Sequence, residues 1–394
     1  MDVQPEKDDF QLEDLKALVG SKLRGFSSEW PEEQGELTYS TVNSESFPVP
    51  ELILLTLRNV MGWKWHGEEE KVRWTVFGSV DGERVGFQLA KFGLKIIRSR
   101  PLIVPQKRIF GQLSSAVTIV EKAFKPYVGK LISQGKFTMA NRYGEFAERY
   151  KFFRQQADKS FRNSERSPKF EPFSKSDDLS FLSARMSTLW SHRIKNNKYG
   201  FYQSVAMVDC YFSSLEHRMV LLRAFVGEHF DEGGFEQFMK LDWDKKLGVF
   251  LDLSRNKSHQ VLLKRMRSLK ERIRNPFAHG GYENDKGGIF VHFPTIGAIP
   301  ANFTDFGKSA RFTFMPVEPE SYRDICQLFD ALDNALSTDN MWGAYKLMEA
   351  GIDPSFDEES LDEYADAIGG GEEGIEAYID HWGHIYERHV NMDY

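Results

Sequence analysis

Residues 201–226, FYQSVAMVDCYFSSLEHRMVLLRAFV, form the most regular stretch of this 394-residue chain. Their large apolar side chains recur at alternating spacings of four and three residues: Phe201, Val205, Val208, Phe212, Leu215, Met219, Leu222 and Val226. This period predicts an amphipathic helix. Its apolar stripe must be buried against other helices or against a second subunit.

Helical spacing continues on both sides of this segment. Further helices are expected around residues 182–189, 235–250, 262–273 and 325–336. Two short apolar runs bounded by glycine and proline, at 289–293 and 311–315, predict a β-hairpin between the last two helices. We therefore expect residues 179–336 to form a helical bundle with a β-hairpin insertion.

The first half of the chain predicts a small α+β domain over residues 36–104. Residues 50–60, PELILLTLRNV, begin with a proline suited to a helix start. Alternating runs at 72–80 and 84–89 flank Asp81-Gly82, a dipeptide that favours a tight hairpin turn. The whole chain is thus expected to be a multidomain α+β protein that is mainly α.

The remaining segments differ in composition. Residues 1–35 are expected to form a weakly ordered N-terminus with at most one short helix. Residues 105–163 are expected to form a basic helical region. Phe146, Tyr150 and Phe153 alternate there with basic residues and could stack on nucleic-acid bases, although such spacing is more typical of a core. Residues 164–178, with two prolines, predict a linker.

Charge is distributed unevenly along the sequence. Residues 91–175 contain 19 lysines and arginines against 6 acidic residues, whereas 337–394 contain 15 acidic residues against 2 basic ones. The second segment is expected to be an acidic C-terminal tail. A basic body with such a tail can bind a polyanion while the tail competes for the same surface, or both can be solvated faces.

Several classes of protein are not indicated. No stretch of about 18 apolar residues predicts a membrane span, and the acidic N-terminus lacks the pattern of a secretory signal. Cys210 and Cys326 are too few for a disulfide framework, and His381, His384 and His389 lack the frame of a metal site. We expect a cytoplasmic protein without a cofactor or metal.

The residues best suited to chemistry are Arg274-Asn275-Pro276-Phe277-Ala278-His279, next to Gly280-Gly281. They follow a segment, 255–274, with eight basic residues and the single acidic Glu271. A guanidinium binds phosphate oxygens in a fixed fork, and imidazole transfers protons near neutral pH. In a straight helix Arg274 and His279 would be about 140° apart. Pro276 disfavours helical geometry at Asn275, so we expect the helix to end or kink there.

A near match, Arg255-Asn256-Lys257-Ser258-His259, shows how readily an arginine and a histidine occur close together. It has one residue fewer between its ends and is expected in a loop. We therefore treat it as a coincidental match.

The later motif resembles that of the HEPN domains, an all-helical family with an arginine, a polar residue, three others and a histidine near the end of a long helix. The resemblance covers roughly residues 179–336. Many members also carry an acidic residue on an upstream helix facing the motif, and Glu216 in Ser213-Ser214-Leu215-Glu216-His217 is similar to that position.

The resemblance implies a metal-independent endoribonuclease that cleaves RNA, including tRNA, through the ribose 2′-hydroxyl and leaves a cyclic phosphate. His279 would transfer protons, Arg274 would bind the scissile phosphate, Asn275 would orient either group, and Glu216 would orient Arg274. Two protomers would form a composite cleft as a homodimer. Such proteins occur as toxins and in anti-phage defence, including abortive infection, with an antitoxin or sensor as partner. The alternative is a catalytically silent HEPN module that binds RNA or a protein partner as an adaptor.

Overall fold

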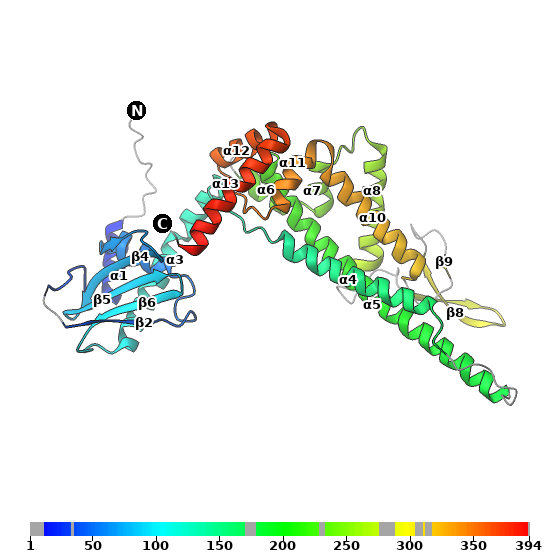
Figure 1. Cartoon of the computed structure of the whole chain (residues 1–394), viewed down its shortest axis with the longest axis horizontal. Helices are drawn as coiled ribbons and strands as arrows, with labels where there is room; N and C mark the ends of the chain where they lie inside the picture. The colour runs from blue at the N-terminus through cyan, green and yellow to red at the C-terminus, as the bar shows by residue number, and fades with distance from the viewer. Residues whose placement is uncertain are drawn as a thin grey trace. The chain divides into compact units, whose positions relative to one another are not determined.

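A computed structural model describes residues 12–32, 35–169, 179–227, 233–275, 288–303, 310–311 and 317–392. The chain is a mainly helical α+β protein, as predicted. It divides into two compact units, Met1–Ile132 with Asp380–Tyr394, and Ser133–Ile379. Figure 1 shows an antiparallel sheet with helices in the first unit and long helices in the second.

The first unit is built on a six-stranded antiparallel sheet in the order β1-β4-β5-β6-β2, with β3 also paired to β4. The strands are β1 (Phe26–Ser27), β2 (Leu37–Thr41), β3 (Lys64–His66), β4 (Val72–Val80), β5 (Glu83–Ala90) and β6 (Gly93–Ser99). The predicted hairpin is confirmed: Val80 pairs with Glu83 across the turn, where Asp81 and Gly82 have φ of 48° and 83°. Both positive values suit the turn that Asp-Gly favours.

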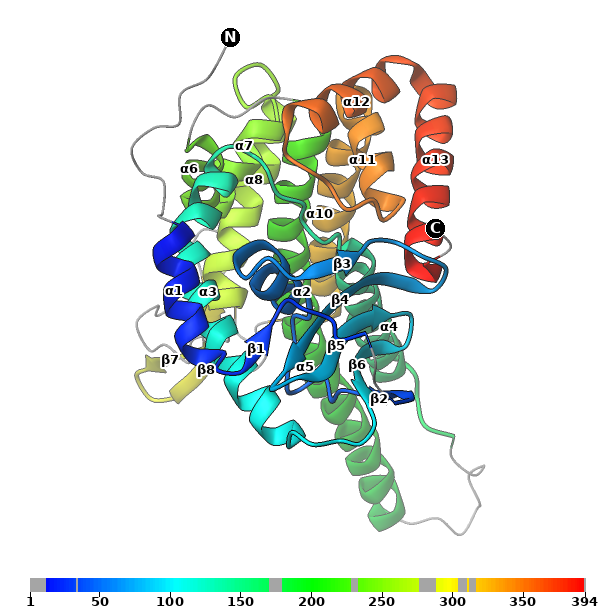
Figure 2. The same cartoon turned by 90° about the vertical axis from the view of Figure 1, so that its left-hand side faces the viewer.

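Helices pack on this sheet to form a single core (Figure 2). They are α1 (Leu12–Lys22), α2 (Glu51–Leu54) continuing as the π-helical η1 (Leu55–Val60), and α3 (Gln106–Ser133). Phe87 and Ile96 of the sheet, Ile53, and Leu113 of α3 are fully buried in it. The helix predicted at 50–60 is confirmed.

The N-terminal segment is more integrated than expected. Leu15 and Val19 of α1 and the following Leu23 are buried in the core of the first unit. The prediction of a weakly ordered N-terminus was therefore wrong for residues 12–32, because three apolar residues spaced four apart cover the sheet. Residues 1–11 lie outside the described part of the chain.

The second unit is organised around two long helices that lie side by side, α4 (Tyr143–Glu165) and α5 (Leu179–Phe225). α5 is one continuous helix of 47 residues, whereas the sequence suggested a break before residue 201. Its predicted stripe is buried within the protomer, since Phe212, Leu215 and Met219 are fully inaccessible. The same chain therefore covers the centre of the stripe, whereas Val205 is half-buried and Val226, at its C-terminal end, is exposed.

The remaining elements surround α5. They are α6 (Gly234–Lys240), α7 (Trp243–Phe250), α8 (Lys257–Leu269), the π-helical η2 (Lys270–Arg274), β7 (Gly288–Phe293), β8 (Gly297–Phe303), β9 (Ala310–Arg311) and α10 (Pro319–Ser337). A small β-hairpin is present, as predicted, but β7 pairs with β8, a strand that was not expected. The run expected at 311–315 is described only at Arg311, in β9, which pairs with β8. Residues 235–250 form two helices instead of one, and residues 312–316 lie outside the described residues.

The acidic segment is a folded part of the protein. It forms η4 (Asp339–Met341), α11 (Trp342–Glu349), α12 (Glu358–Gly369) and α13 (Gly371–Asn391). Leu347 and Met348 are fully buried, and the ring of Tyr364 packs on that of Phe225 with centroids 5.0 Å apart. Because its helices have buried residues and pack on α5, this segment is not the free tail that was expected to compete for a basic surface.

Two expected boundaries also fall elsewhere. α3 belongs mainly to the first unit and α4 to the second, so residues 105–163 are not one region. The linker expected at 164–178 begins later, since Ser164 is buried in α4 and its hydroxyl donates to the Phe161 carbonyl at 2.7 Å. Tyr150 is buried against Tyr211 and Phe329, which confirms the core interpretation for this residue, whereas Phe146 and Phe153 are half-buried. None of the described helices is long and apolar enough to cross a membrane.

Candidate functional site

The basic helix α8 begins at a well-defined cap and points its apolar residues inward. The Asn256 side chain accepts hydrogen bonds from the backbone N–H groups of Ser258 and His259 at 2.9 and 3.3 Å. Leu263, Met266 and Leu269 are buried. The asparagine of the near match is thus a helix N-cap, and His259 lies in the first turn of a helix instead of the expected loop.

Asn275, the last described residue before a gap in the description, still has helical geometry, so the helix end or kink expected there is not tested by the described residues. Asn275 has φ −62° and ψ −47°, which are helical values. A distortion lies one turn earlier, where Lys270–Arg274 form a π-helical turn. Arg274 is the last residue of this irregular turn, and such turns are frequent at functional sites.

Arg274 is held at the surface between two carboxylates of α5. Its Nε lies 3.3 Å from Oδ1 of Asp209, and its Nη1 lies 3.9 Å from Oε1 of Glu216. The guanidinium also lies 5.6 Å from the centroid of the Phe212 ring. The Arg274 side chain is 22% exposed, and those of Asp209 and Glu216 are 53% and 42% exposed. The structure thus brings Arg274 and Glu216 together, with much of the site open to solvent.

Asp209 is the residue that the sequence analysis missed. It precedes Glu216 by seven residues, which is two turns of α5, so both carboxylates lie on one face of the helix. Phe212 lies between them at spacings of three and four. The signal was present in the sequence: an acidic residue two turns before Glu216, on the helix expected to face the motif.

A second cation, Lys270, lies one turn before Arg274. Its Nζ is 5.1 Å from the centroid of the Trp243 ring and 5.9 Å from that of Phe212. Burial, and then the neighbouring charge of Arg274, lower the pKa of Lys270 below its usual value. The two cations and the two carboxylates form a compact charged site around Phe212.

The other two motif residues are less completely placed. Asn275 is half-buried and directly follows Arg274. Pro276 and His279 lie outside the described residues. The Arg274 guanidinium can bind one phosphate, and the carboxylates of Asp209 and Glu216 can hold the guanidinium in position for it.

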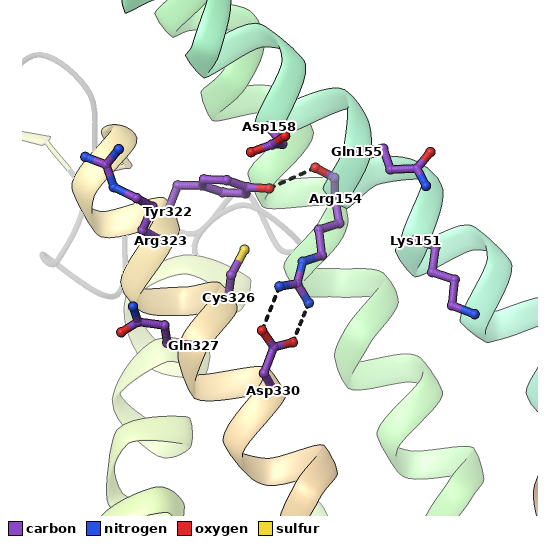
Figure 3. A pocket seen from close by; sticks show the side chains of 9 residues that line it. All are labelled: Lys151, Arg154, Gln155, Asp158, Tyr322, Arg323, Cys326, Gln327 and Asp330. Atoms are coloured by element: carbon purple, nitrogen blue, oxygen red, sulfur yellow. Dashed lines mark hydrogen bonds and ion pairs between the residues drawn. The ribbon is translucent and has the colours of Figure 1, made fainter.

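A separate polar groove of about 560 Å³ lies between α4 and α10 (Figure 3). The Arg154 guanidinium and the Asp330 carboxylate form two hydrogen bonds across it, and the Tyr322 hydroxyl donates to the Arg154 carbonyl at 2.8 Å. Burial raises the pKa of both the Tyr322 hydroxyl and the Cys326 thiol. The thiol therefore stays protonated, and the groove has the features of a helix contact more than those of a nucleophilic site.

No group of three or more histidine, cysteine, aspartate or glutamate side chains stands close enough to hold a metal ion within the described ranges. Comparison of the chain with protein-family models, with curated proteins and with solved structures found no match.

Proposed function

We propose that this protein is a metal-independent endoribonuclease of the HEPN type. The observation that carries the proposal is the position of Arg274 at the end of a basic helix, beside Asp209 and Glu216 of the upstream helix. This is the partner that the family resemblance implies for the motif arginine. The sequence motif supplies Asn275 and His279.

In this proposal each residue has a distinct task. His279 takes the proton from the ribose 2′-hydroxyl or protonates the leaving oxygen, which suits an imidazole near pH 7. Arg274 binds the scissile phosphate and stabilises its additional negative charge in the transition state. Glu216 and Asp209 hold the guanidinium in place, and Asn275 orients the phosphate or the imidazole. The nucleophilic 2′-hydroxyl restricts the substrate to RNA, tRNA included.

The biological setting and the partners belong to the same proposal. An RNase of this kind acts in the cytoplasm as a toxin or an anti-phage defence effector, under the control of an antitoxin or sensor. The proposed homodimer uses a surface other than the Leu215 and Met219 stripe, because both side chains are fully buried within the protomer.

The alternative is a silent HEPN module that binds RNA or a protein partner without cleaving. The exposed basic residues of α8 favour this reading equally, since phosphate contacts need no proton transfer. It predicts affinity for RNA that falls steeply with salt, and no strand scission.

The test is incubation of the purified protein with tRNA and with total RNA in excess EDTA, followed by analysis of the product ends. The wild type is compared with His279→Ala and with His259→Ala, a matched control from the near match. Cyclic phosphate ends that are lost only in His279→Ala are the expected result. An unchanged cleavage rate in His279→Ala removes the catalytic assignment. If the wild type and both variants bind RNA but leave it intact, the silent module is favoured.

A further inference from the structure

The N-terminal half of α5 carries aromatic rings and lysines on a face open to solvent. Tyr199 and Tyr202 are 46% and 53% exposed. Lys195 lies with its Nζ 5.9 Å from the Tyr199 ring centroid, and Lys198 lies 5.7 Å from that of Tyr202. Each lysine therefore pairs with a tyrosine four residues later. We name Lys195, Lys198, Tyr199 and Tyr202 the lysine–tyrosine face.

The charge of this half of the helix has one sign. From residue 179 to residue 208 the sequence contains four lysines and arginines and no aspartate or glutamate. Asp209 is the first acidic residue of α5. A surface with this charge is complementary to a polyanion, and its exposed rings offer flat surfaces on which bases can stack.

The opposite side of the same helix is occupied by α4. A Cβ atom at Gly200 would come within 2.6 Å of the Phe161 ring, so the two helices are in close contact there. The Ser160 hydroxyl also bonds the Gln203 side chain at 2.7 Å. Figures 1 and 2 show the first turns of α5 extending past the end of α4. The lysine–tyrosine face thus points away from the helix that α5 packs against.

The lysine–tyrosine face is aligned with the candidate site. Lys195, Tyr202, Asp209 and Glu216 follow one another at intervals of seven residues. Seven residues complete two helical turns within about 20°, so all four lie along one side of α5. A strand bound on the lysine–tyrosine face would continue along this side toward the carboxylates that hold Arg274.

We propose that the lysine–tyrosine face binds single-stranded RNA, with bases stacked on Tyr199 and Tyr202 and phosphates bound by Lys195 and Lys198. This names the form of the RNA for the ribonuclease proposed above and rests on that function for its link to cleavage. A second copy of the chain is a poorer occupant, because two such helices would bring lysines and arginines together without a carboxylate between residues 179 and 208.

The experiment measures fluorescence anisotropy of a labelled single-stranded RNA whose 2′-hydroxyls are methylated, in EDTA, so that binding is recorded without the proposed cleavage. Tyr199→Ala/Tyr202→Ala is expected to weaken binding roughly fivefold or more, the loss of at least one stacked base. Lys195→Gln/Lys198→Gln is expected to reduce the slope of log affinity against log salt by about 1.4, since each single-strand phosphate contact contributes about 0.7.

Matched controls lie in the first unit. Phe92→Ala removes a ring that is 84% exposed, and Lys16→Gln/Lys64→Gln removes two exposed lysines. Both controls should bind RNA as the wild type does. Equal affinity in the α5 variants and the wild type overturns the proposal. So does a change of oligomeric state without a change in RNA affinity, or binding of anionic vesicles but not of RNA.

The outcomes separate this inference from the proposed function. If RNA binding depends on the lysine–tyrosine face but the protein leaves unmodified RNA intact, the binding proposal is supported and the proposed ribonuclease activity is contradicted. If cleavage is lost in His279→Ala but is unaffected by the α5 variants, the proposed ribonuclease activity is supported and the proposed role of the lysine–tyrosine face is contradicted.

Discussion

Arg218 and Arg274 both form ion pairs with carboxylates near the same stretch of α5, but the two arginines differ in how far they are buried. Arg218 is 3% exposed; its Nη1 lies 2.6 Å from Oδ1 of Asp333, and the Tyr211 hydroxyl donates to the same oxygen at 2.7 Å. Arg274 is 22% exposed, and its two carboxylates lie at 3.3 and 3.9 Å with about half of their surface in solvent. One arginine is enclosed in the bundle, and the other is held at its edge.

The difference separates a structural arginine from one that can bind a ligand. Arg218 and Asp333 neutralise each other where no phosphate can reach, so their contribution is to stability. The guanidinium of Arg274 is aligned by long contacts that a phosphate can replace or extend. The two sites can therefore be distinguished by mutations, since one set should alter stability and the other activity.

The largest effect is expected from removing the buried carboxylate. Asp333→Ala leaves the charge of Arg218 uncompensated inside the bundle, and we expect the free energy of unfolding to fall by about 3 kcal/mol. This is the lower end of the range for breaking a buried pair, because Asp333 itself is 32% exposed. Urea unfolding of the wild type and of Asp333→Ala measures this loss of stability. The double variant Arg218→Met/Asp333→Leu should recover part of the loss, and a loss as large as that of the single variant would contradict this explanation.

The second prediction concerns Arg274→Ala. We expect the unfolding free energy to change by less than about 1 kcal/mol, since exposed ion pairs contribute little. RNA cleavage should fall by about 10²- to 10³-fold, the usual loss for one group that stabilises transition-state charge. Cleavage rate and urea midpoint are measured on the same preparation, with Arg255→Ala as the control. An Arg274→Ala protein that unfolds much more readily would place this arginine with Arg218.

The third prediction compares the two carboxylates of the candidate site. Asp209→Asn and Glu216→Gln should each lower kcat, with roughly a tenfold loss for Asp209→Asn, or about 1.4 kcal/mol of transition-state stabilisation. The effect of Asp209 should be the larger because its carboxylate is nearer to Arg274. Both variants remove a negative charge next to the RNA, so KM should fall while kcat falls. Unchanged kcat with altered stability would assign both residues a structural role only.

The smallest effect is expected from His217, which lies between Glu216 and Arg218 on α5. Its Nε2 accepts a hydrogen bond from the backbone N–H of Arg142 at 3.0 Å, which requires the neutral ring. Burial, and then the charge of Arg142, lower the pKa of His217 below its usual value.

The folded protein therefore binds a proton at His217 less readily than the unfolded chain does. This contribution to stability is complete above the unfolded pKa of about 6.5 and is lost as the pH falls through the folded value. In His217→Gln, which keeps an acceptor but does not titrate, the loss of stability between about pH 7 and pH 5 should be shallower. Parallel stability profiles for the two proteins would show that His217 does not contribute.

The secondary structure followed from periodicity where one pattern dominated. The stripe of residues 201–226, the helix at 325–336 and the hairpin at Asp81-Gly82 were predictable because each depends on local spacing or turn chemistry. The continuity of α5 was not predictable, since residues 182–199 are mostly exposed and carry no buried stripe. Nor was the burial of residues 12–23, which depends on a sheet formed by residues far away in sequence.

The candidate site was predicted in part. Arg274 and Glu216 were paired correctly because both stand on regular helices whose facing sides could be inferred. Asp209 was missed, although its spacing from Glu216 indicates the same face. The π-helical turn at residues 270–274 was not anticipated, because the only distortion expected from the sequence was placed at Asn275, next to the proline. Among the interleaved aromatic and basic residues, Tyr150 of α4 is in the core, whereas Tyr199 and Tyr202 of α5 are exposed, a difference that the sequence spacing does not reveal.

The continuity of α5 also has a metric consequence. Tyr202 and Asp209 are joined by seven residues of unbroken helix, which fixes their separation along the axis at about 10 Å. An RNA strand stacked on the tyrosine would present to Arg274 a phosphate at a set distance from the stacked base. The helix would then act as a ruler, so that the scissile bond is chosen by counting nucleotides from an anchored base instead of by reading the sequence at the cut.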